Sequence, residues 1–429
     1  MASSVNPPRG MRDFLPTDKA RRERVLGIIR SVFSAHGFDE IETPVMEDSA
    51  RLHAGLGGDN EKLAFGVLKR GLTTADFAAA TDALDLADLG LRFDLTVPLA
   101  RFYATHRAEL PKIFRAIQIA PVWRAERPQH GRYRQFIQCD IDIIGEEGSL
   151  AEIELITATL HTLDVLGLSQ CTIRINDRRV LTGLLDHVAL PREQHEAALV
   201  TIDKLDKLGP DGVVTELRTR QFDDAAITML DHYLAGAIGL DLVNFTAEQL
   251  AGHLPSEVDR VVIEELVALA DGIQAAGFDR SRIKFDPFLV RGMGYYTGTI
   301  FEIEHPDLPY SLGGGGRYDG MIGRFLGVDV PAVGFSIGFE RIVDLVQLHE
   351  DESAGGVALV YDSDVTPAAL MQLKAELVAS GRRVRLERAP RNLKPLLAQL
   401  AASGFVEIAT VSTGAATLAD LRMRKLAAG

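Results

Sequence analysis

The sequence predicts an α+β protein: a mixed, mainly antiparallel sheet with flanking helices, a helical insertion and a small C-terminal α/β domain. Three observations lead to this prediction. The strand-like segments are rarely separated by helices of βαβ length, which disfavours a parallel Rossmann sheet. Residues 190–277 have a helical pattern with few strand-like runs. After residue 356, strand-like and helix-like segments alternate.

The first element is an amphipathic helix over residues 17–36, because apolar residues recur at helical spacing between Val25 and Phe33. The strand that follows contains Pro44. Since proline cannot donate to a ladder, this strand is expected at an edge or a break. Further strands are predicted at residues 91–95, 113–122, 136–144, 171–175, 300–304 and 332–335.

These patterns divide the chain into five parts. Residues 1–185 and 283–346 form the two parts of a core, which the helical insertion, 186–282, interrupts. A polar linker, 347–356, leads to the last domain, 357–429. That domain has the order β-α-β-α-β, and no clear closing strand follows.

Composition excludes several classes of protein. The 429 residues are 46% hydrophobic and 25% charged, as in a globular protein. Two cysteines and no secretory signal indicate a reducing compartment and predict a cytoplasmic location. Apolar runs are shorter than the ~20 residues of a membrane helix, so no membrane partner is predicted. A net charge of −14 disfavours general nucleic-acid binding but allows local basic patches.

The segment WRAERPQHGRYRQFIQCDIDIIG, residues 123–145, concentrates positive charge. Four arginines lie between Arg124 and Arg134, and Pro128 and Gly131 mark a turn between two strand-like stretches. A guanidinium can bind phosphate oxygens bidentately and stays charged, so this hairpin suits a phosphate ligand. A solvated, salt-bridged hairpin has the same pattern, and the residue types leave both readings open.

Two glycine-bearing segments follow later in the core. In FLVRGMGYYTGTIFEIE, residues 288–304, Arg291 stands beside glycines that allow close approach to a ligand, and a Tyr-Tyr pair offers hydroxyl groups. A strand–turn–strand with core tyrosines is the alternative. LGGGGRYDG, residues 312–320, predicts a tight approach or a turn rather than the middle of a strand, and it is not a P-loop.

Two further segments supply charged side chains. In AVGFSIGFERIVDLV, residues 332–346, a strand passes through Gly338 into a helix whose first turn contains Arg341, a combination that suits an anion. In LRFDLTVPLARFY, residues 91–103, Asp94 and Thr96 are expected on one face of a strand, where they could receive an ammonium group. A buried strand–helix junction and a half-exposed strand face are the respective alternatives.

In this order, the segments resemble the motifs of class II aminoacyl-tRNA synthetases, most closely the histidyl-tRNA synthetase family. The strand around Pro44 is similar to the dimer-forming first motif, WRAERPQHGRYRQF to the second and VGFSIGFERI to the third. LVRGMGYYTGTIFE and GGGGRYD are similar to two segments particular to the histidine family. The resemblance covers nearly the whole chain. It implies a class II synthetase-like homodimer that activates L-histidine with ATP and transfers it to the 3′ end of tRNA(His).

The resemblance also implies a role for each matching position. Arg291 and Arg124 would be catalytic, because they would stabilise the charge that develops at the α-phosphate. ATP would be bound by Arg124, Glu126, Arg132, Phe136 and Arg341. Histidine would be bound by Asp94, Thr96, Gln138, Asp142, Tyr295 and Tyr296. Mg²⁺ would enter with ATP, and no resident metal is implied.

For tRNA, the resemblance implies that the insertion lies against the acceptor arm and that the loop around Gln129 and His130 meets the acceptor end. The last domain resembles an anticodon-binding domain, although it is short. Its basic residues offer either a phosphate-binding face or a solvated surface. They are Arg382, Arg383, Arg385, Arg388, Arg391 and Lys394.

The chain also departs from the family pattern. Gly294 stands where the family usually has an acidic residue, and Asp94 and Asp142 stand where many bacterial members have glutamate. The main alternative function is a non-catalytic, histidine-sensing regulatory subunit of ATP phosphoribosyltransferase, which is expected to lose the ATP-binding arginines. A synthetase for another amino acid and a non-catalytic RNA-binding module fit the segments less well.

Overall fold

The computed structural model describes residues 5–53, 63–128, 131–237, 242–291, 294–348, 356–415 and 417–426. Gln129, His130 and linker residues 349–355 lie outside these ranges. The chain divides into two compact units, Met1–Arg12 with Val25–Val346, and Asp13–Arg24 with Gln347–Gly429. Within the described ranges, no helix combines the length and apolar character that crossing a membrane requires.

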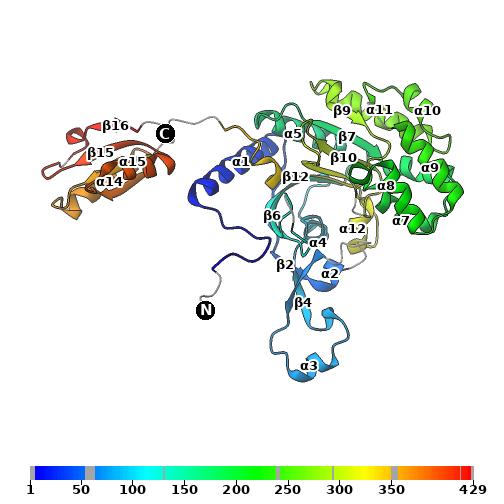
Figure 1. Cartoon of the computed structure of the whole chain (residues 1–429), viewed down its shortest axis with the longest axis horizontal. Coiled ribbons are helices and arrows are strands. Elements are labelled where there is room, and N and C mark those ends of the chain that lie inside the picture. The colour runs from blue at the N-terminus through cyan, green and yellow to red at the C-terminus, as the bar shows by residue number, and fades with distance from the viewer. Residues whose placement is uncertain are drawn as a thin grey trace. The chain divides into compact units, whose positions relative to one another are not determined.

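A nine-stranded sheet organises the first unit, in the order β1-β5-β6-β12-β11-β10-β7-β9-β8 (Figure 1). Neighbouring strands are antiparallel except for the β1–β5 and β7–β9 pairs, which confirms the predicted mainly antiparallel sheet. The strands are β1 (Asp39–Glu40), β5 (Phe114–Trp123), β6 (Gln135–Ile144), β7 (Thr172–Asp177), β8 (Leu242–Val243), β9 (Ile283–Phe285), β10 (Thr299–Glu304), β11 (Gly313–Arg317) and β12 (Ala332–Gly338).

Helices cover this sheet and bury its apolar side chains. Helix α5 contacts β6 and β12 and buries residues on nearly every side, including Leu155, Ile156 and Leu160. A helix that is apolar all round must be buried, as this one is. The helices are α1 (Pro16–Ala35), α2 (Ser49–His53), α4 (Thr96–His106), α5 (Leu150–Val165), α6 (Arg178–His187), α12 (Asp319–Leu326) and α13 (Phe339–Ile342).

The strand predicted at residues 91–95 is wrong beyond Leu91. Strand β4 (Ala87–Leu91) ends there, and α4 begins at Thr96. Asp94 Oδ1 accepts a hydrogen bond from the backbone N–H of Val97 at 3.2 Å, and Pro98 lies in the first turn, where its missing N–H costs nothing. Asp94 and Thr96 are therefore neighbours at the start of a helix and do not share a strand face.

The glycine run at 313–316 also differs from its prediction. It forms β11 in the middle of the sheet, where a turn or an open approach was expected. A Cβ atom on Gly315 would lie 1.9 Å from the carbonyl oxygen of Gly334, and one on Gly314 would lie 2.8 Å from the Arg291 guanidinium. Other groups do approach the glycine backbone closely, as expected, but these groups are the neighbouring strands and Arg291.

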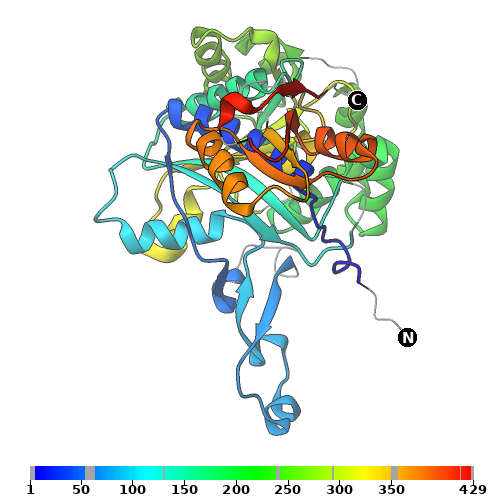
Figure 2. The same ribbon diagram turned by 90° about the vertical axis from the view of Figure 1, so that its left-hand side faces the viewer.

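A second, three-stranded sheet was not predicted. It has the order β2-β4-β3 and is antiparallel, with β2 at Met46–Asp48 and β3 at Phe65–Leu68. Pro44 lies in the break between β1 and β2, which belong to different sheets, as its position in the sequence indicated. Together with α3 (Thr74–Ala79), this sheet extends away from the nine-stranded sheet (Figures 1 and 2).

Residues 190–277 are mainly helical, and the apolar faces of the helices between residues 195 and 237 form one core. Leu199, Val213 and Leu230 pack there with Phe288 and Ile300 from the sheet side. Strand β8 is short and was not predicted, since two residues carry no periodic signal. The helices are α7 (His195–Ile202), α8 (Leu205–Thr219), α9 (Asp224–Ala237), α10 (Ala247–His253) and α11 (Arg260–Ala275).

The second unit contains a four-stranded sheet in the order β14-β13-β15-β16. Strands β13, β14 and β15 are parallel, as the β-α-β-α-β pattern indicates. The expectation of no closing strand is wrong, because β16 pairs antiparallel with β15 at Ile408 and Arg424. The elements are β13 (Gly356–Tyr361), α14 (Pro367–Ala379), β14 (Val384–Arg388), α15 (Leu393–Ala402), β15 (Phe405–Val411) and β16 (Met423–Lys425).

Candidate active site

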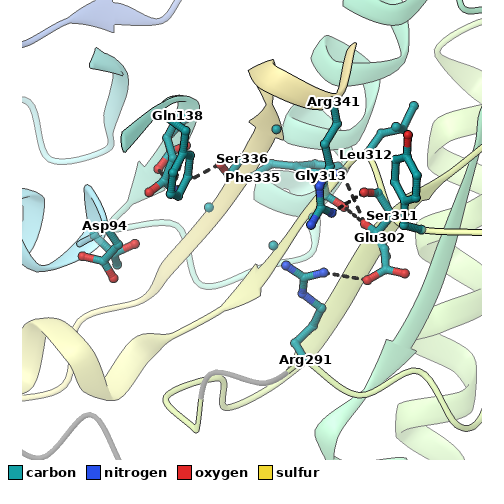
Figure 3. A pocket seen from close by; sticks show the side chains of 18 of the residues that line it. Asp94, Gln138, Arg291, Glu302, Ser311, Leu312, Gly313, Phe335, Ser336 and Arg341 are labelled. Atoms are coloured by element: carbon teal, nitrogen blue, oxygen red, sulfur yellow. Dashed lines mark hydrogen bonds and ion pairs between the residues drawn. The ribbon is translucent and has the colours of Figure 1, made fainter. Parts of the chain in front are cut away.

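A cavity of about 570 Å³ in the first unit is the candidate active site, and this volume falls in the range of ligand pockets. Figure 3 shows its two ends: Asp94 and Gln138 lie at one, and Arg291, Glu302 and Arg341 at the other. All of the residues predicted from the sequence to bind histidine or ATP line this cavity. They are Asp94, Thr96, Arg124, Glu126, Arg132, Phe136, Gln138, Asp142, Arg291, Tyr295, Tyr296 and Arg341.

Strand β6 supplies polar side chains to the first end, which we call the carboxylate end and define by Asp94, Gln138, Asp140 and Asp142. Residues two apart on a strand point to the same face, so Gln138, Asp140 and Asp142 all face the cavity. Burial raises the pKa of Asp94 to about 6 and that of Asp142 to about 7. Burial, and then the neighbouring Asp142, raise the pKa of Asp140 as well.

A buried hydrogen bond orients Asp142. The Tyr318 hydroxyl donates to Asp142 Oδ1 at 2.6 Å, and the Tyr318 ring meets that of Tyr295 edge-on at 6.1 Å. Gly334 of β12 makes room for this pair, since a Cβ atom there would lie 2.0 Å from Asp142 Oδ1. Asp142 thereby presents its second oxygen among aromatic side chains. These include Tyr296, whose ring centre lies 4.7 Å from that of Tyr295.

Two acceptor atoms at the carboxylate end are buried and have no hydrogen-bond partner in the part of the chain that the structure describes. They are Asp94 Oδ2 and Gln138 Oε1. Leaving a buried acceptor unpaired costs about 1–3 kcal/mol, more when the group is charged. Such atoms in a ligand-sized cavity indicate a ligand that donates hydrogen bonds, and an ammonium group is the strongest such donor.

Arginines line the other end, which we call the arginine end and define by Arg124, Arg132, Arg291 and Arg341. Arg291 Nη1 donates to Glu302 Oε2 at 2.6 Å. The other oxygen of Glu302 lies 3.5 Å from Arg174 Nη1, so that Glu302 is held from both sides. This arrangement fixes the Arg291 guanidinium against the glycine strand β11 and leaves Nη2 and Nε as further donors.

Arg124 and Arg132 come from the β5–β6 hairpin. Arg124 Nε donates to the carbonyl oxygen of Phe93 at 3.0 Å, and its guanidinium carbon lies 5.0 Å from the centre of the Phe136 ring. Arg132 Nη1 lies 3.6 Å from Glu126 Oε2. The hairpin thus places a flat aromatic ring and two cations in the same cavity, which suits a nucleotide.

Arg341 lies on α13 directly after β12. Its Nη1 donates to the carbonyl oxygen of Ser311. Burial, and then the positive charges of Arg132 and Arg291, lower the pKa of Arg341. Several like charges held together in a partly buried site favour a multiply charged anion such as a polyphosphate.

Sequence reasoning missed several residues that line the cavity: Asp140, Glu302, Ser336, Tyr318 and the insertion residues Asp203 and Asp206. Alternation along β6 was the available signal for Asp140, and the GGGGRYD segment was the signal for Tyr318. Nothing local marked Asp203 or Asp206, because their contribution depends on where α7 and α8 pack.

Comparisons with known proteins show the family of the chain. The sequence model of the family described as histidyl-tRNA synthetase matches residues 10–342. The chain is 60% identical over 429 residues to a protein of Leifsonia xyli subsp. xyli named histidine–tRNA ligase, covering 98% of this chain and 99% of that protein. It is 44% identical over 415 residues to a protein of Tropheryma whipplei strain Twist named probable histidine–tRNA ligase, covering 94% of each.

Solved structures have the same fold. A crystal structure of histidyl-tRNA synthetase from Nostoc sp. PCC 7120 matches with a TM-score of 0.76 at 25% identity, covering 99% of this chain and 95% of that one. A Bacillus halodurans structure, described as an ATP phosphoribosyltransferase regulatory subunit/histidyl-tRNA synthetase, matches with a TM-score of 0.76 at 21% identity over 97% of this chain and all of that chain. The fold is that of a class II synthetase-like α+β protein. The chain belongs to the histidyl-tRNA synthetase family.

Proposed function

We propose that this enzyme is a histidine–tRNA ligase that activates L-histidine with ATP and transfers it to the 3′ end of tRNA(His). The observation that carries the proposal is the division of one cavity into a carboxylate end and an arginine end. The first end suits an amino acid with an ammonium group and an imidazole, and the second suits a polyphosphate. The near full-length similarity to proteins named histidine–tRNA ligase supports the same reaction.

Histidine would bind at the carboxylate end. Its α-ammonium would donate to the unpaired oxygens of Asp94 and Gln138, with Thr96 beside them. Its imidazole would lie between Asp142 and Tyr296, with Tyr295 on one side. An analogue without a ring nitrogen would leave one of these buried groups unpaired, which is the strongest basis for rejecting a substrate.

ATP would bind at the arginine end. Phe136 would stack on adenine, Arg124 would hold the α-phosphate, and Arg132 and Arg341 would hold the distal phosphates. Glu126 steadies Arg132 through the 3.6 Å ion pair. Mg²⁺ would arrive with ATP as part of the substrate and neutralise phosphate charge.

The chemical step needs no protein nucleophile. The histidine carboxylate attacks the α-phosphorus of ATP, the bond to the β-phosphate oxygen breaks, and pyrophosphate leaves. Arg291 and Arg124 would stabilise the negative charge that develops on the α-phosphate oxygens, since their guanidinium groups are already fixed by Glu302 and Phe93. A terminal ribose hydroxyl of the tRNA then attacks the activated carboxyl carbon, and AMP leaves.

The tRNA would contact three parts of the chain. The insertion, residues 186–282, would lie against the acceptor arm, and the segment at Gln129 and His130 would meet the acceptor end. The domain at 357–429 would bind the anticodon, where Arg383 and Arg385 lie within 4.7 Å of the Phe405 ring. Arginine side chains can neutralise the phosphates of a nucleic acid. The core would be residues 1–185 and 283–346, and the linker 347–356.

We also propose that the enzyme is a cytoplasmic homodimer. The segment around Pro44 supports the dimer through its similarity to the dimer-forming motif of the class. Light scattering of the purified chain should give twice the mass of 46.7 kDa at micromolar concentration. A mass equal to one chain would contradict the dimer without affecting the assignment of the reaction.

The alternative function is a histidine-sensing regulatory subunit of ATP phosphoribosyltransferase. Such a subunit would have no need for phosphate-binding arginines, yet Arg124, Arg291 and Arg341 all line the cavity. The decisive assay is ATP–pyrophosphate exchange with each of the twenty amino acids, followed by charging of tRNA. Exchange with histidine alone supports the ligase. Histidine binding without any exchange would favour the regulatory subunit.

A further inference from the structure

Asp140 is a buried carboxylate that the proposed reaction does not use. It lies in the middle of β6, with its Cα opposite Gln118 of β5 and Ser336 of β12, and only 5% of the residue is exposed. Burying an ionisable group is unfavourable unless specific partners compensate. A serine or asparagine would be tolerated on this strand at lower cost, so the carboxylate at this position calls for a functional explanation.

Asp140 contacts the amide of Gln138, and the Ser336 hydroxyl donates a hydrogen bond to the Asp140 carboxyl group as well. Gln138 Nε2 lies 3.2 Å from Asp140 Oδ2, 3.5 Å from Asp140 Oδ1 and 3.3 Å from Ser336 Oγ. The Gln118 side chain, which is opposite Asp140, is engaged elsewhere: its Nε2 donates to the carbonyl oxygen of Leu95 at 3.0 Å. The amide nitrogen of Gln138 is therefore held by acceptors on two strands.

This contact decides which way the Gln138 amide faces. An amide has a donor end and an acceptor end that differ only in their partners. The Asp140 carboxyl oxygens lie on the side of the amide nitrogen and accept from it, so Oε1 points away from Asp140. Oε1 is indeed buried and without a hydrogen-bond partner among the described residues, as is Asp94 Oδ2. Both atoms are left for the same ligand group.

We propose that Asp140 is a positioning residue for amino-acid selection, which fixes the Gln138 amide so that its oxygen receives the α-ammonium of histidine. The inference rests on the proposed function, because it requires that ammonium group at the carboxylate end. Asp140 acts through Gln138 and does not contact the substrate. Without it, the amide can rotate and present its NH₂ group to the ammonium, which repels it.

The test is a comparison of two ligands on the full-length protein. L-Histidine and 3-(imidazol-4-yl)propanoate, which lacks only the α-amino group, are titrated by calorimetry into the wild type, Asp140→Ala, Gln138→Ala and the double variant. Asp140→Ala should weaken histidine binding about 10-fold or more, the size of a hydrogen bond to a charged group. Binding of the des-amino analogue should change less than about 3-fold, because this analogue lacks the ammonium group that Gln138 would receive.

Two further results distinguish positioning from other roles. In the Gln138→Ala background, Asp140→Ala should have no additional effect, because the two residues act as one unit. Asp140→Asn should bind histidine within about 3-fold of the wild type, since the asparagine oxygen still accepts from Gln138. Asp88→Ala, an exposed carboxylate on β4, is the matched control and should leave both ligands unaffected.

Three outcomes would overturn the inference. Equal loss of both ligands in Asp140→Ala would make Asp140 merely structural. Additive loss in the double variant, or an Asp140→Asn variant as weak as Asp140→Ala, would mean that its charge acts on the substrate directly. Asp140→Ser, too short to reach the Gln138 amide, replaces Asp140→Ala if that variant does not fold. A wild type that does not prefer histidine to the analogue would instead contradict the proposed function.

Discussion

The two ends of the cavity handle charge in opposite ways. At the carboxylate end, three aspartates are buried together, and two acceptor atoms have no partner in the described part of the chain. At the arginine end, the cations already have partners: Arg291 with Glu302, Arg132 with Glu126 and Arg341 with the carbonyl oxygen of Ser311. One end is incomplete without a ligand, whereas the other is assembled in advance.

This difference fits the two tasks that the reaction sets. Selecting one amino acid requires that wrong substrates leave buried groups unpaired, and under the proposed function the carboxylate end would impose that cost. Stabilising charge in a transition state requires donors that are fixed before the reaction, and under the proposed function the arginine end would provide them. Variants at the arginine end should therefore reduce kcat, and variants at the carboxylate end should raise KM for histidine.

The largest effect is expected for Arg291→Ala. Removing one preorganised donor should lower kcat of histidine-dependent ATP–pyrophosphate exchange about 10²–10³-fold. Histidine binding, measured by calorimetry, should change less than about 3-fold, because the residue lies at the other end of the cavity. Arg107→Ala, an exposed arginine at the end of α4, is the control. A rise in KM for histidine without a fall in kcat would contradict the proposed separation of roles between the two ends of the cavity.

Asp94→Asn should act on histidine instead. The asparagine oxygen can still accept from the N–H of Val97, so the start of α4 is retained while the negative charge is lost. A hydrogen bond to a charged group contributes about 1.5–3 kcal/mol, so KM for histidine should rise about 10–100-fold. KM for ATP should stay near the wild-type value. If both constants rise together, the two ends do not act separately.

Tyr318→Phe should have a smaller effect of the same kind. It removes the 2.6 Å hydrogen bond that orients Asp142 and keeps the ring that packs on Tyr295. An intramolecular hydrogen bond contributes about 1 kcal/mol net, so KM for histidine should rise about 5-fold. Exchange kinetics with varied histidine measure this directly. An unchanged KM would mean that Asp142 needs no orientation by Tyr318.

The smallest effect is a pH dependence of stability. Burial raises the pKa of Asp142 to about 7, above the value of 3.8 for the unfolded chain. The folded state therefore holds the proton more tightly, and the stability that this group contributes is present below about pH 4 and lost as the pH rises through 7.

Asp142→Asn removes this titration. In calorimetric scans without ligand, the Tm of the variant relative to the wild type should be higher at pH 8 than at pH 5. Each kcal/mol corresponds to about 2–4 °C for a domain of moderate size. If the difference in Tm between the variant and the wild type is the same at both pH values, the raised pKa of Asp142 is contradicted.

Most of the sheet could be predicted from the sequence because its strands carry apolar or alternating patterns, as 136–144 does. The strand at Gly313–Arg317 could not, because four glycines have no propensity for a strand and their place is decided by the crowded backbones beside them. The start of α4 was also misjudged. Pro98 is compatible with the first turn of a helix, so it does not exclude a helix that begins at Thr96.

The site was predicted where motifs are contiguous, as with Arg124 to Asp142. It was missed where a residue enters the cavity through tertiary packing. Asp203 lies at the end of α7, far along the chain from any motif, and it reaches the cavity only because the helices pack against the sheet. Tyr318 was seen as part of a motif, but its bond to Asp142 joins residues 176 positions apart.

The central claim is that the two ends form one site for one intermediate, and binding of a non-hydrolysable histidyl-adenylate analogue, the histidyl sulfamoyl adenosine, tests it most directly. Calorimetry should find this compound bound at least about 100-fold more tightly than histidine or ATP alone, as expected for a ligand close to the reacting state. Both Asp94→Asn and Arg124→Ala should weaken it. An analogue bound no more tightly than histidine, or unaffected by either variant, would contradict the account.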